Sequence, residues 1–380
     1  MYNGPGVEHM EWIAAAAFGL EGLVKEELAD LGIKARAEQG GARFEAGVED
    51  AFRANLWLSC ADRVQLVVGE QTVTSFEALF DFVISLPWED YLPTDANFPV
   101  SGNCVRSQLM SVSDCQSITK KAIVERLKRK SKLGWFPETG SKYPVHLSIH
   151  RDRARVTLDT SGEALNRRGY RTWVGEAPLR ETLAAALVRL SPWQPGRMLY
   201  DPCCGTGTLL IEAAFLASKR APGLNRGFAM ENWVMAEPGA FARIRSEAQA
   251  LYQADARLEL AGSDLDPDAL ALCGLHLKQA GLQNAIRVRQ CDMREVRLKE
   301  EGICFLTNPP YGERMGDKKE AAQVAQALGT LLSAHRNATL CVITPDPAFE
   351  AHARHRAHKR RRLYNGRLEC EFLVMSSQEG

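Results

Sequence analysis

The sequence predicts an α/β protein, with a doubly wound parallel sheet in its C-terminal part and two smaller α+β units before it. Three short apolar runs predict the sheet, because each is followed by a turn that carries a polar side chain, at Asp201, Asp264 and Asn308. Such runs, alternating with helices that have an apolar face, are typical of parallel strands buried on both faces. Ligands of open α/β sheets bind beyond the carboxyl ends of the strands, so the three turns predict one shared site.

The composition is that of an ordinary globular protein. The chain has 380 residues, 45% of them apolar, and its 47 Lys and Arg balance its 47 Asp and Glu. This length predicts two or three domains. No apolar run approaches the roughly eighteen residues of a transmembrane helix, and the N-terminus does not resemble a signal peptide. We therefore expect the ten scattered cysteines to be reduced thiols of a cytoplasmic protein. A net charge of zero disfavours a globally basic nucleic-acid-binding protein but leaves room for local patches.

Residues 1–63 predict a small ferredoxin-like unit. Strand-like runs lie within residues 12–18 and 33–46, and helical patterns cover residues 19–31 and 48–61. Strands that alternate with helices in so short a segment are typical of this arrangement. None of these residues predicts chemistry.

Residues 64–165 predict a second α+β unit with a basic helix. Residues 113–132 are expected to be helical, and seven Lys or Arg lie from Lys120 to Lys132 against one acid, Glu125. A charge run on a helix is most often a solvated face, so this run alone does not identify a binding surface.

Three arginines, Arg151, Arg153 and Arg155, alternate along a predicted strand, which would place their guanidinium groups on one face. Together with the basic helix they predict a phosphate-binding surface, because Lys and Arg neutralise backbone charge without reading sequence. The candidate contacts on the helix are Lys120, Lys121, Lys128 and Arg129.

Residues 161–177 predict a connection into a C-terminal domain that covers residues 166–380. Tyr170 and Trp173 lie beside three arginines, so they either contact RNA or pack the domain joint, and the joint is favoured. Pro178 is expected to open the helix that follows.

The segment from Asp201 to Thr208, Asp-Pro-Cys-Cys-Gly-Thr-Gly-Thr, follows a short strand and turns into an apolar helix. This order predicts a cofactor loop. A dinucleotide fingerprint would have a third glycine where Leu210 stands and an acid about twenty residues later. The next acid at a strand end, Asp264, comes much later, after an insertion rich in Trp, Arg and Gly. The loop therefore predicts a cofactor that carries a nucleoside without a pyrophosphate.

Two further aspartates follow strands. Asp266 fits a helix N-cap with Pro267 behind it, which leaves Asp264 free to accept hydrogen bonds from both ribose hydroxyls. Asp292 follows the next strand and could accept from an adenine amino group. Each aspartate taken singly also fits a helix cap, but their succession at strand ends favours a cofactor site.

The turn Asn308-Pro309-Pro310-Tyr311 is the candidate catalytic element. Its prolines fix φ and remove two N–H donors, so the turn presents carbonyl oxygens beside the side-chain oxygen of Asn308. Such acceptors suit a planar amino group, and Tyr311 offers a ring face to the base that carries it. Taken alone, the four residues also fit a surface turn. No cysteine lies in the turn, so covalent catalysis is not expected.

These motifs resemble those of a known family. Together with Arg168-Gly169-Tyr170-Arg171 and Leu363-Tyr364-Asn365-Gly366, they are similar to the THUMP-domain RNA methyltransferases that modify the exocyclic amine of guanine. The resemblance extends over nearly the whole chain and is especially to bacterial 23S rRNA guanine-N2 methyltransferases. DNA amino-methyltransferases share the Asn-Pro-Pro-Tyr motif, and the THUMP-type N-terminal half is what indicates RNA.

The resemblance implies a Rossmann-like methyltransferase domain at residues 166–380 and a THUMP RNA-binding domain at residues 64–165, with S-adenosylmethionine as the cofactor. The residues it assigns to the cofactor are Pro178, Asp201, Cys204, Gly205, Gly207, Asp264, Asp292 and Asn308. The residues it assigns to catalysis are Asn308, Pro309, Pro310 and Tyr311. Further RNA contacts are expected from Arg168, Arg361 and Arg362, the last two in a run of Arg and His that begins at His352.

The predicted function is S-adenosylmethionine-dependent methylation of a guanine N2 amine in structured RNA, either 23S rRNA or a ribosome-assembly intermediate. Guanine N2, adenine N6 and cytosine N4 all satisfy the acceptor turn, and the choice of guanine rests on the resemblance. The alternatives are a tRNA substrate, a DNA amino-methyltransferase and an RNA-binding protein without activity. No His or Cys cluster has the spacing of metal ligands, so neither a metal nor a membrane partner is expected.

Overall fold

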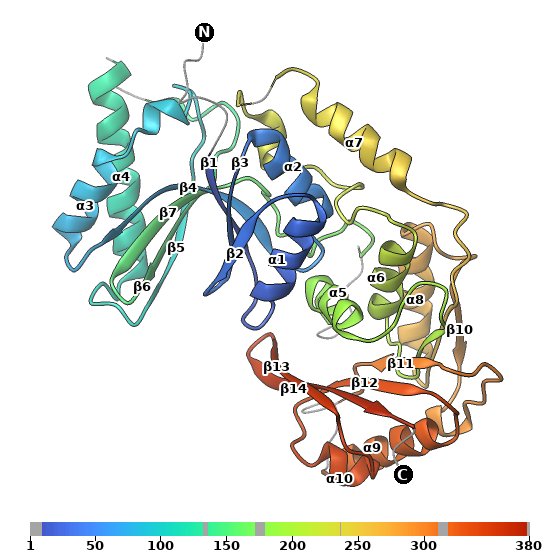
Figure 1. The fold of residues 1–380 in the computed structure, drawn as a ribbon. Helices are drawn as coiled ribbons and strands as arrows, with labels where there is room; N and C mark the ends of the chain where they lie inside the picture. The colour runs from blue at the N-terminus through green and yellow to red at the C-terminus, as the bar shows by residue number, and fades with distance from the viewer. Residues whose placement is uncertain (1–9, 132–135, 172–178, 236, 311–317, 378–380) are drawn as a thin grey trace. The chain divides into compact units, whose positions relative to one another are not determined.

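The structure is a computed structural model that describes residues 10–131, 136–171, 179–235, 237–310 and 318–377 (Figure 1). Contacts between residues divide the chain into two units. The first unit comprises Met1–Ala16, Val24–Leu165 and Gly227–Ser246, and the second comprises Ala17–Leu23, Asn166–Arg226 and Glu247–Gly380. No helix within the described ranges is long and apolar enough to cross a membrane.

The first unit is built on one sheet with the strand order β2-β3-β1-β4-β7-β6-β5. Strand β4 pairs with β1 on one side and with β7 on the other, so the two α+β units expected from the sequence share a continuous sheet. Of the neighbouring pairs in this sheet, β5 and β6 are parallel. The strands are β1 (Met10–Ala15), β2 (Ala35–Glu38), β3 (Gly41–Ala46), β4 (Arg63–Thr72), β5 (Val100–Val105), β6 (Val145–His150) and β7 (Arg153–Asp159).

Four helices accompany this sheet along the chain: α1 (Glu21–Asp30), α2 (Val48–Trp57), α3 (Phe76–Ser85) and α4 (Val112–Ser131). The α3 helix begins as local chemistry dictates, because the Ser75 side chain accepts from the backbone of Ala78 as an N-cap. The basic helix expected at residues 113–132 is α4, and it packs against α3, β5 and β6.

The sequence predicted that Arg151, Arg153 and Arg155 share one face of a strand, and this prediction is wrong for Arg151. Arg151 lies in the turn between β6 and β7 with φ of 51°, and β7 begins at Arg153. Arg153 and Arg155 do lie on one face, where both pair with the carboxylate of Glu70, and Arg155 also pairs with Glu38 at 2.6 Å. Both guanidinium groups therefore already have acidic partners on the same sheet, although the Arg153 side chain remains largely exposed.

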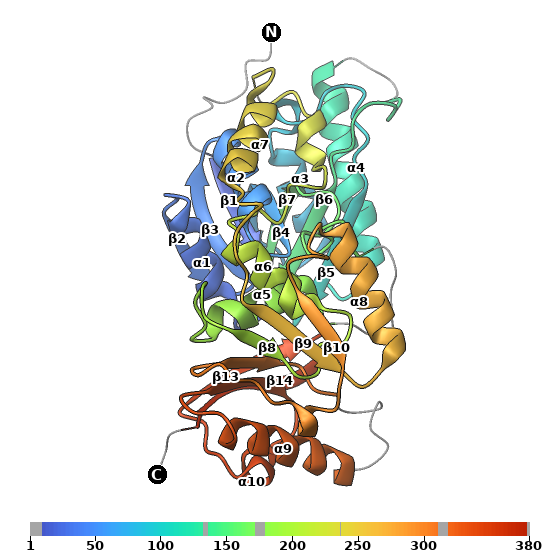
Figure 2. The same cartoon turned by 90° about the vertical axis from the view of Figure 1, so that its right-hand side faces the viewer.

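The second unit is built on a sheet with the strand order β10-β9-β8-β11-β12-β14-β13. Strands β8 to β12 are parallel, and β14 and β13 extend the sheet in antiparallel fashion (Figure 2). The chain order reverses between β8 and β11, which is the topological switch point at which such sheets bind ligands. The strands are β8 (Leu199–Asp201), β9 (Leu260–Asp264), β10 (Arg287–Gln290), β11 (Cys304–Thr307), β12 (Thr339–Thr344), β13 (Lys359–Asn365) and β14 (Leu368–Ser376).

Helices cover both faces of this sheet (Figures 1 and 2). One face carries α5 (Glu181–Leu190), α6 (Thr208–Ala217) and α8 (Pro267–Gln279), and the other carries α9 (Lys318–Ser333) and α10 (Phe349–Ala353). Tyr200, Phe305 and Val342 project from the strands into a core with Leu328 and Leu332 of α9. Burial on both faces explains why these strands read as continuous apolar runs.

Part of the insertion between α6 and β9 packs in the first unit rather than with the sheet of the second unit. Its residues Gly227–Ser246 belong to the first unit. Trp233 stacks on Tyr143 with ring centroids 4.7 Å apart, and Phe241 stacks on Phe52 at 4.3 Å. These aromatic contacts hold the start of α7 (Ala240–Leu251) on the first unit. The C-terminal domain expected at residues 166–380 is therefore interrupted by a segment that packs elsewhere.

Candidate active site

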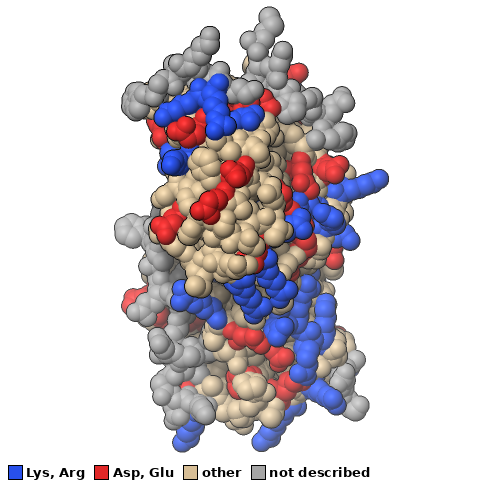
Figure 3. Space-filling view, turned by 90° about the vertical axis from the view of Figure 1, so that its left-hand side faces the viewer, with Lys and Arg blue, Asp and Glu red and all other residues tan. Residues whose placement is uncertain are grey.

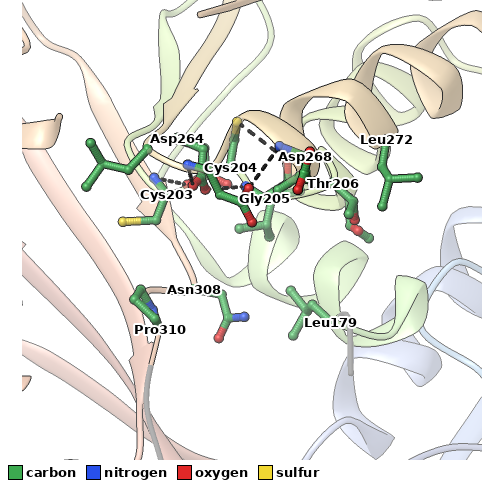
Figure 4. Close-up of a pocket in the computed structure, with 16 residues that line it drawn as sticks. Leu179, Cys203, Cys204, Gly205, Thr206, Asp264, Asp268, Leu272, Asn308 and Pro310 are labelled. Carbon is green, nitrogen blue, oxygen red and sulfur yellow. Dashed lines mark hydrogen bonds between the residues drawn. The ribbon is translucent and has the colours of Figure 1, made fainter. Parts of the chain in front are cut away.

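A cavity of about 550 Å³ opens at the carboxyl ends of β8, β9 and β11. Figure 4 shows the loop from Cys203 to Thr206 and Asp264 on one side of it and Asn308 with Pro310 on the other. Six of the residues predicted from the sequence line it: Asp201, Cys204, Gly205, Asp264, Asn308 and Pro310. The switch point of the sheet thus brings together turns that lie about a hundred residues apart in the chain.

The glycine loop owes its shape to two left-handed residues. Gly205 and Gly207 have φ of 50° and 83°, which is costly for any residue with a Cβ atom. At Gly207 a Cβ would also lie 2.6 Å from the sulfur of Cys273. Gly207 does not line the cavity, and it is the N-cap residue from which α6 begins at Thr208.

Asp264 ties the glycine loop to the neighbouring strand. Its Oδ2 accepts from the amide of Gly205 at 2.7 Å, and its Oδ1 accepts from the amide of Asp266 at 3.0 Å. The sequence suggested that this carboxylate is free, but in the structure both its oxygens accept hydrogen bonds from backbone amides. Each oxygen still keeps a second lone pair, and the residue lines the cavity. The expected N-cap is confirmed, because Asp266 accepts from Asp268 with Pro267 at the first helical position.

Asp201 is buried beneath the loop. Its Oδ1 accepts from the hydroxyl of Thr307 at 2.7 Å and from the amide of Cys203 at 3.1 Å. Burial raises the pKa of this carboxyl to about 7; the two hydrogen bonds oppose the rise, and the charge of Asp264 adds to it. Asp201 therefore links β8 to β11 and shapes the floor of the cavity.

Asn308 presents an unusual acceptor. Its side-chain oxygen is buried and has no hydrogen-bond partner among the described residues, although the residue lines the cavity. A buried acceptor without a partner costs roughly 1–3 kcal/mol, so native proteins rarely leave one without a purpose. The position next to the two prolines makes this oxygen available to a donor that enters the cavity.

Family models match three parts of the chain. Residues 11–65 match the RlmL ferredoxin-like domain, and residues 73–159 match the THUMP domain. Residues 168–373, more than half of the chain, match the RMKL-like methyltransferase domain. The chain belongs to the RMKL-like methyltransferase family. The expected fold, cofactor and family are confirmed: this methyltransferase uses S-adenosylmethionine.

Two curated relatives are similar over nearly all of this methyltransferase. The protein named "Putative RNA methyltransferase YpsC" from Bacillus subtilis is 38% identical over 95% of this chain and 94% of the relative. The ribosomal RNA large subunit methyltransferase K/L of Syntrophotalea carbinolica is 33% identical over 96% of this chain and 53% of the relative. The chain thus spans about half the length of the K/L relative.

Two crystal structures have the same fold. SMU.472, complexed with SAH, has a TM-score of 0.93 and 35% identity, covering 98% of this chain and 99% of that one. A protein from Listeria monocytogenes, named a predicted N6-adenine-specific DNA methylase, has a TM-score of 0.91 and 40% identity, covering 97% and 96%.

The cavity of this methyltransferase fits its cofactor. Its volume suits a nucleoside joined to an amino acid. The carboxylate of Asp264 and the loop at Gly205 would hold polar groups, and Leu265 and Leu272 supply an apolar wall for a base. Asp268, Ala269 and Leu272 of α8 were not predicted from the sequence, because the face that this helix turns to the cavity depends on tertiary packing.

The cofactor contact predicted for Asp292 stays a prediction. Asp292 does not line the cavity. Its Oδ1 accepts from the amide of Arg294 at 2.9 Å, and both its oxygens accept from the Arg294 guanidinium. These contacts lower the pKa of Asp292 and satisfy its oxygens, so it serves as a cap of the short helix that follows. Two other predicted residues, Pro178 and Tyr311, lie outside the described residues.

The four residues of α4 that were predicted to contact RNA differ in how strongly they are engaged by other groups of the protein. Lys120 donates to the carbonyl of Phe98 at 3.1 Å and pairs with Glu138 at 2.8 Å, so it is largely used within the protein. Lys128 lies 3.7 Å from Glu125, while Lys121 and Arg129 are exposed. On the face drawn in Figure 3, Lys and Arg gather in groups with Asp and Glu among them.

Arg168 corrects another prediction. Its guanidinium is buried at 3% exposure and pairs with Glu212. The hydroxyl of Tyr170, also buried, donates to the same carboxylate at 3.1 Å. Both residues pack the interior of the second unit, so neither offers a group to RNA. Arg361 is partly buried and donates to the carbonyl of Gly19 at 2.6 Å, whereas Arg362 is exposed.

Proposed function

We propose that this methyltransferase transfers the methyl group of S-adenosylmethionine to the N2 amine of a guanine in RNA, with 23S rRNA as the substrate. The observation that carries the proposal is the buried oxygen of Asn308 at the cofactor cavity, for which the described part of the chain offers no hydrogen-bond partner. An acceptor in this place selects a substrate that brings an N–H donor.

The acceptor turn would activate the amine. The lone pair of an exocyclic amine is delocalised into the base, which makes the nitrogen a weak nucleophile. Hydrogen bonds from its two protons to the Asn308 oxygen and to the carbonyl of Pro309 localise the lone pair and orient it. The bound cofactor supplies an electrophilic methyl group on sulfur, and alignment of the amine with that group provides most of the remaining rate.

No general base beside the amine is required at the start, because the protonated amine that forms loses its proton readily to solvent. Hydroxyl or ring-nitrogen acceptors would need a different set of groups around the turn. The base must leave its stack to reach the turn, as in other enzymes that act on base amines.

RNA is favoured over DNA by the N-terminal half of the chain. Residues 73–159 match the THUMP domain, and the K/L and YpsC relatives are named as RNA methyltransferases. The Listeria structure carries the name of an adenine-specific DNA methylase, and the same turn suits adenine N6. DNA adenine methylation is therefore the second candidate.

One experiment separates the candidates. The protein is incubated with radiolabelled S-adenosylmethionine and, in parallel, with unmodified 23S rRNA, unmodified tRNA and unmethylated DNA, and the nucleosides are resolved by mass spectrometry. We expect N2-methylguanosine from 23S rRNA. If N2-methylguanosine formed only in tRNA, the substrate would be tRNA rather than 23S rRNA. N6-methyladenine in DNA as the sole product would refute the proposal.

A further inference from the structure

Phe18 is the most exposed aromatic side chain of the part of the chain that the structure describes, with 52% of its surface accessible. The sequence predicted a strand as far as this residue, but β1 ends at Ala15, and Phe18 lies in the loop that leads to α1. This loop belongs to the second unit, whose strand β13 it contacts. Single exposed apolar side chains are common on protein surfaces, so the exposure of Phe18 is informative only together with the residues that surround it.

The loop is fixed on β13 by its backbone. The guanidinium of Arg361 donates to the carbonyl of Gly19 at 2.6 Å, and the Glu21 carboxylate accepts from the Gly19 amide at 2.8 Å. Gly19 has φ of 89°, and a Cβ there would lie 3.0 Å from the carbonyl oxygen of Arg362. Only glycine permits this close approach without strain. Phe18 is therefore held rigidly rather than exposed by a loose loop.

Two side chains of β13 flank the ring. Tyr364 meets Phe18 edge to face, with centroids 5.8 Å apart and planes at 80°. The guanidinium of Arg362 lies 5.8 Å from the ring centroid, in cation–π range. An exposed aromatic ring, held rigidly beside a guanidinium, is the arrangement with which proteins stack unpaired bases and neutralise their phosphates.

The charge around the ring suits a polyanion. Strand β13 begins with four consecutive cations, from Lys359 to Arg362, but Arg360 pairs with Glu350 at 2.8 Å and Arg361 donates to Gly19, so the cation offered beside the ring is Arg362. The acid nearest to Arg362 is Glu369 at 3.9 Å, and both side chains are more than half exposed. A surface pair with this separation contributes little, so a phosphate can replace it.

We infer that Phe18, flanked by Tyr364 and Arg362, is a stacking platform for an unpaired base of the RNA substrate, with Arg362 on the adjoining phosphate. The inference rests on the proposed function only in that RNA is the ligand. The RNA bound by this platform is single-stranded, because a duplex hides the base faces that a stacking ring needs.

The test measures binding without the cofactor, so its outcome does not depend on which base is methylated. A fluorescein-labelled oligouridylate is titrated with wild-type protein and with Phe18→Ala, Phe18→Trp and Arg362→Ala, and the anisotropy is followed at several salt concentrations. The matched control is Leu368→Ala, which removes an exposed apolar side chain from the partner strand of the same hairpin. Circular dichroism and S-adenosylmethionine affinity confirm that each variant is folded.

Phe18→Ala should weaken oligouridylate binding about 5- to 150-fold, the range found when a stacking ring is removed. It should leave the salt dependence unchanged, because no phosphate contact is lost. Phe18→Trp should bind at least as tightly as wild type, and Leu368→Ala should match it. Arg362→Ala should instead reduce the log–log salt slope by about 0.7, the contribution of one contact to a single strand.

Two outcomes would overturn the inference. One is unchanged affinity of Phe18→Ala for the oligouridylate, which would leave protein docking as the use of the exposed ring. The other is equal weakening of binding to a blunt RNA duplex, which would show that base stacking is not involved. Neither outcome bears on the methylated product, which is identified separately.

Discussion

The hydroxyl of Thr307 donates a hydrogen bond to the buried carboxylate of Asp201 at 2.7 Å. Asp201 ends β8 just before the glycine loop, and Thr307 ends β11 just before the acceptor turn. The two strands pair only at Cys304 and Phe305, so this side-chain contact continues the connection to the edge of the cavity. It thereby sets the separation between the cofactor loop and Asn308.

Replacing Thr307 by valine should show how much this contact contributes. The change keeps the side-chain shape, but leaves the buried carboxyl of Asp201 without one of its two donors. We expect a loss of roughly 1–3 kcal/mol in the free energy of unfolding, measured in urea, with slower methyl transfer. Thr307→Ser keeps the hydroxyl and should lie close to wild type. Equal stability of the valine variant and wild type would mean that the bond is not structural.

The stability of the protein should depend on pH through Asp201. Burial, opposed by the donors Thr307 and Cys203, raises the pKa of this carboxyl to about 7 in the fold, against about 3.9 in an unfolded chain. Between these values the folded protein binds more protons than the unfolded one. The contribution of this group to stability is therefore fully present below about pH 4 and is lost as the pH rises through about 7.

The comparison with Asp201→Asn measures this effect, because the amide does not titrate. The unfolding free energy of wild type, relative to the variant, should fall by up to about 4 kcal/mol as the pH rises from about 4 to about 8. Denaturation curves at several pH values give the difference directly. Parallel profiles for the two proteins would mean that Asp201 titrates normally in the fold.

Much of the site could be predicted because strand ends carry a local signature. Apolar runs followed by Asp201, Asp264 and Asn308 indicated parallel strands, and parallel strands place their ends at one edge. The N-cap pair Asp266 and Pro267 was also visible, since capping depends on neighbours in sequence.

Some features could not be predicted because they depend on residues that are distant in the sequence. Arg168 was predicted to be a surface cation, but it is buried and contacts Glu212, which lies 44 residues further on. The aromatic contacts that hold the insertion on the first unit, such as Trp233 on Tyr143, join residues that are still further apart in sequence. The contact of Arg294 with Asp292 is local, yet nothing in the pattern distinguishes it from a free carboxylate.

Asn308→Ala should separate catalysis from cofactor binding. The truncation removes an oxygen that has no partner in the described ranges, so no hydrogen bond of the described residues is lost. Turnover should fall roughly 10²- to 10³-fold, by analogy with the loss of one preorganised polar contact in other active sites. S-adenosylmethionine affinity by calorimetry should stay near that of wild type. Asn284→Ala, an exposed asparagine of the same unit, is the control. Lost cofactor affinity with normal turnover would contradict the assigned role.

Asp264→Asn should have the reverse effect. Its carboxylate holds the Gly205 amide at 2.7 Å and faces the cavity, so the substitution weakens a charge-assisted contact and replaces one acceptor by a donor. We expect weaker S-adenosylmethionine binding by calorimetry, with turnover largely retained when the cofactor is saturating. Asp346→Asn is the control, because Asp346 also accepts from a backbone amide, that of Ala348 at 2.9 Å, and does not line the cavity. An unchanged dissociation constant for Asp264→Asn would refute the assignment.

The basic helix α4 should contribute to RNA affinity through the cations that the protein does not use itself. Lys121, Lys128 and Arg129 are candidates, whereas Lys120 is already paired with Glu138. Replacing the three by glutamine should reduce the log–log salt slope of RNA binding by about two to three units, since each phosphate contact releases condensed counterions. Lys120→Gln alone should leave the slope nearly unchanged. Methyl transfer at saturating RNA should survive the triple substitution, because α4 belongs to the first unit and the cofactor cavity to the second. An unaltered slope with lost activity would show instead that the cations of α4 serve the fold.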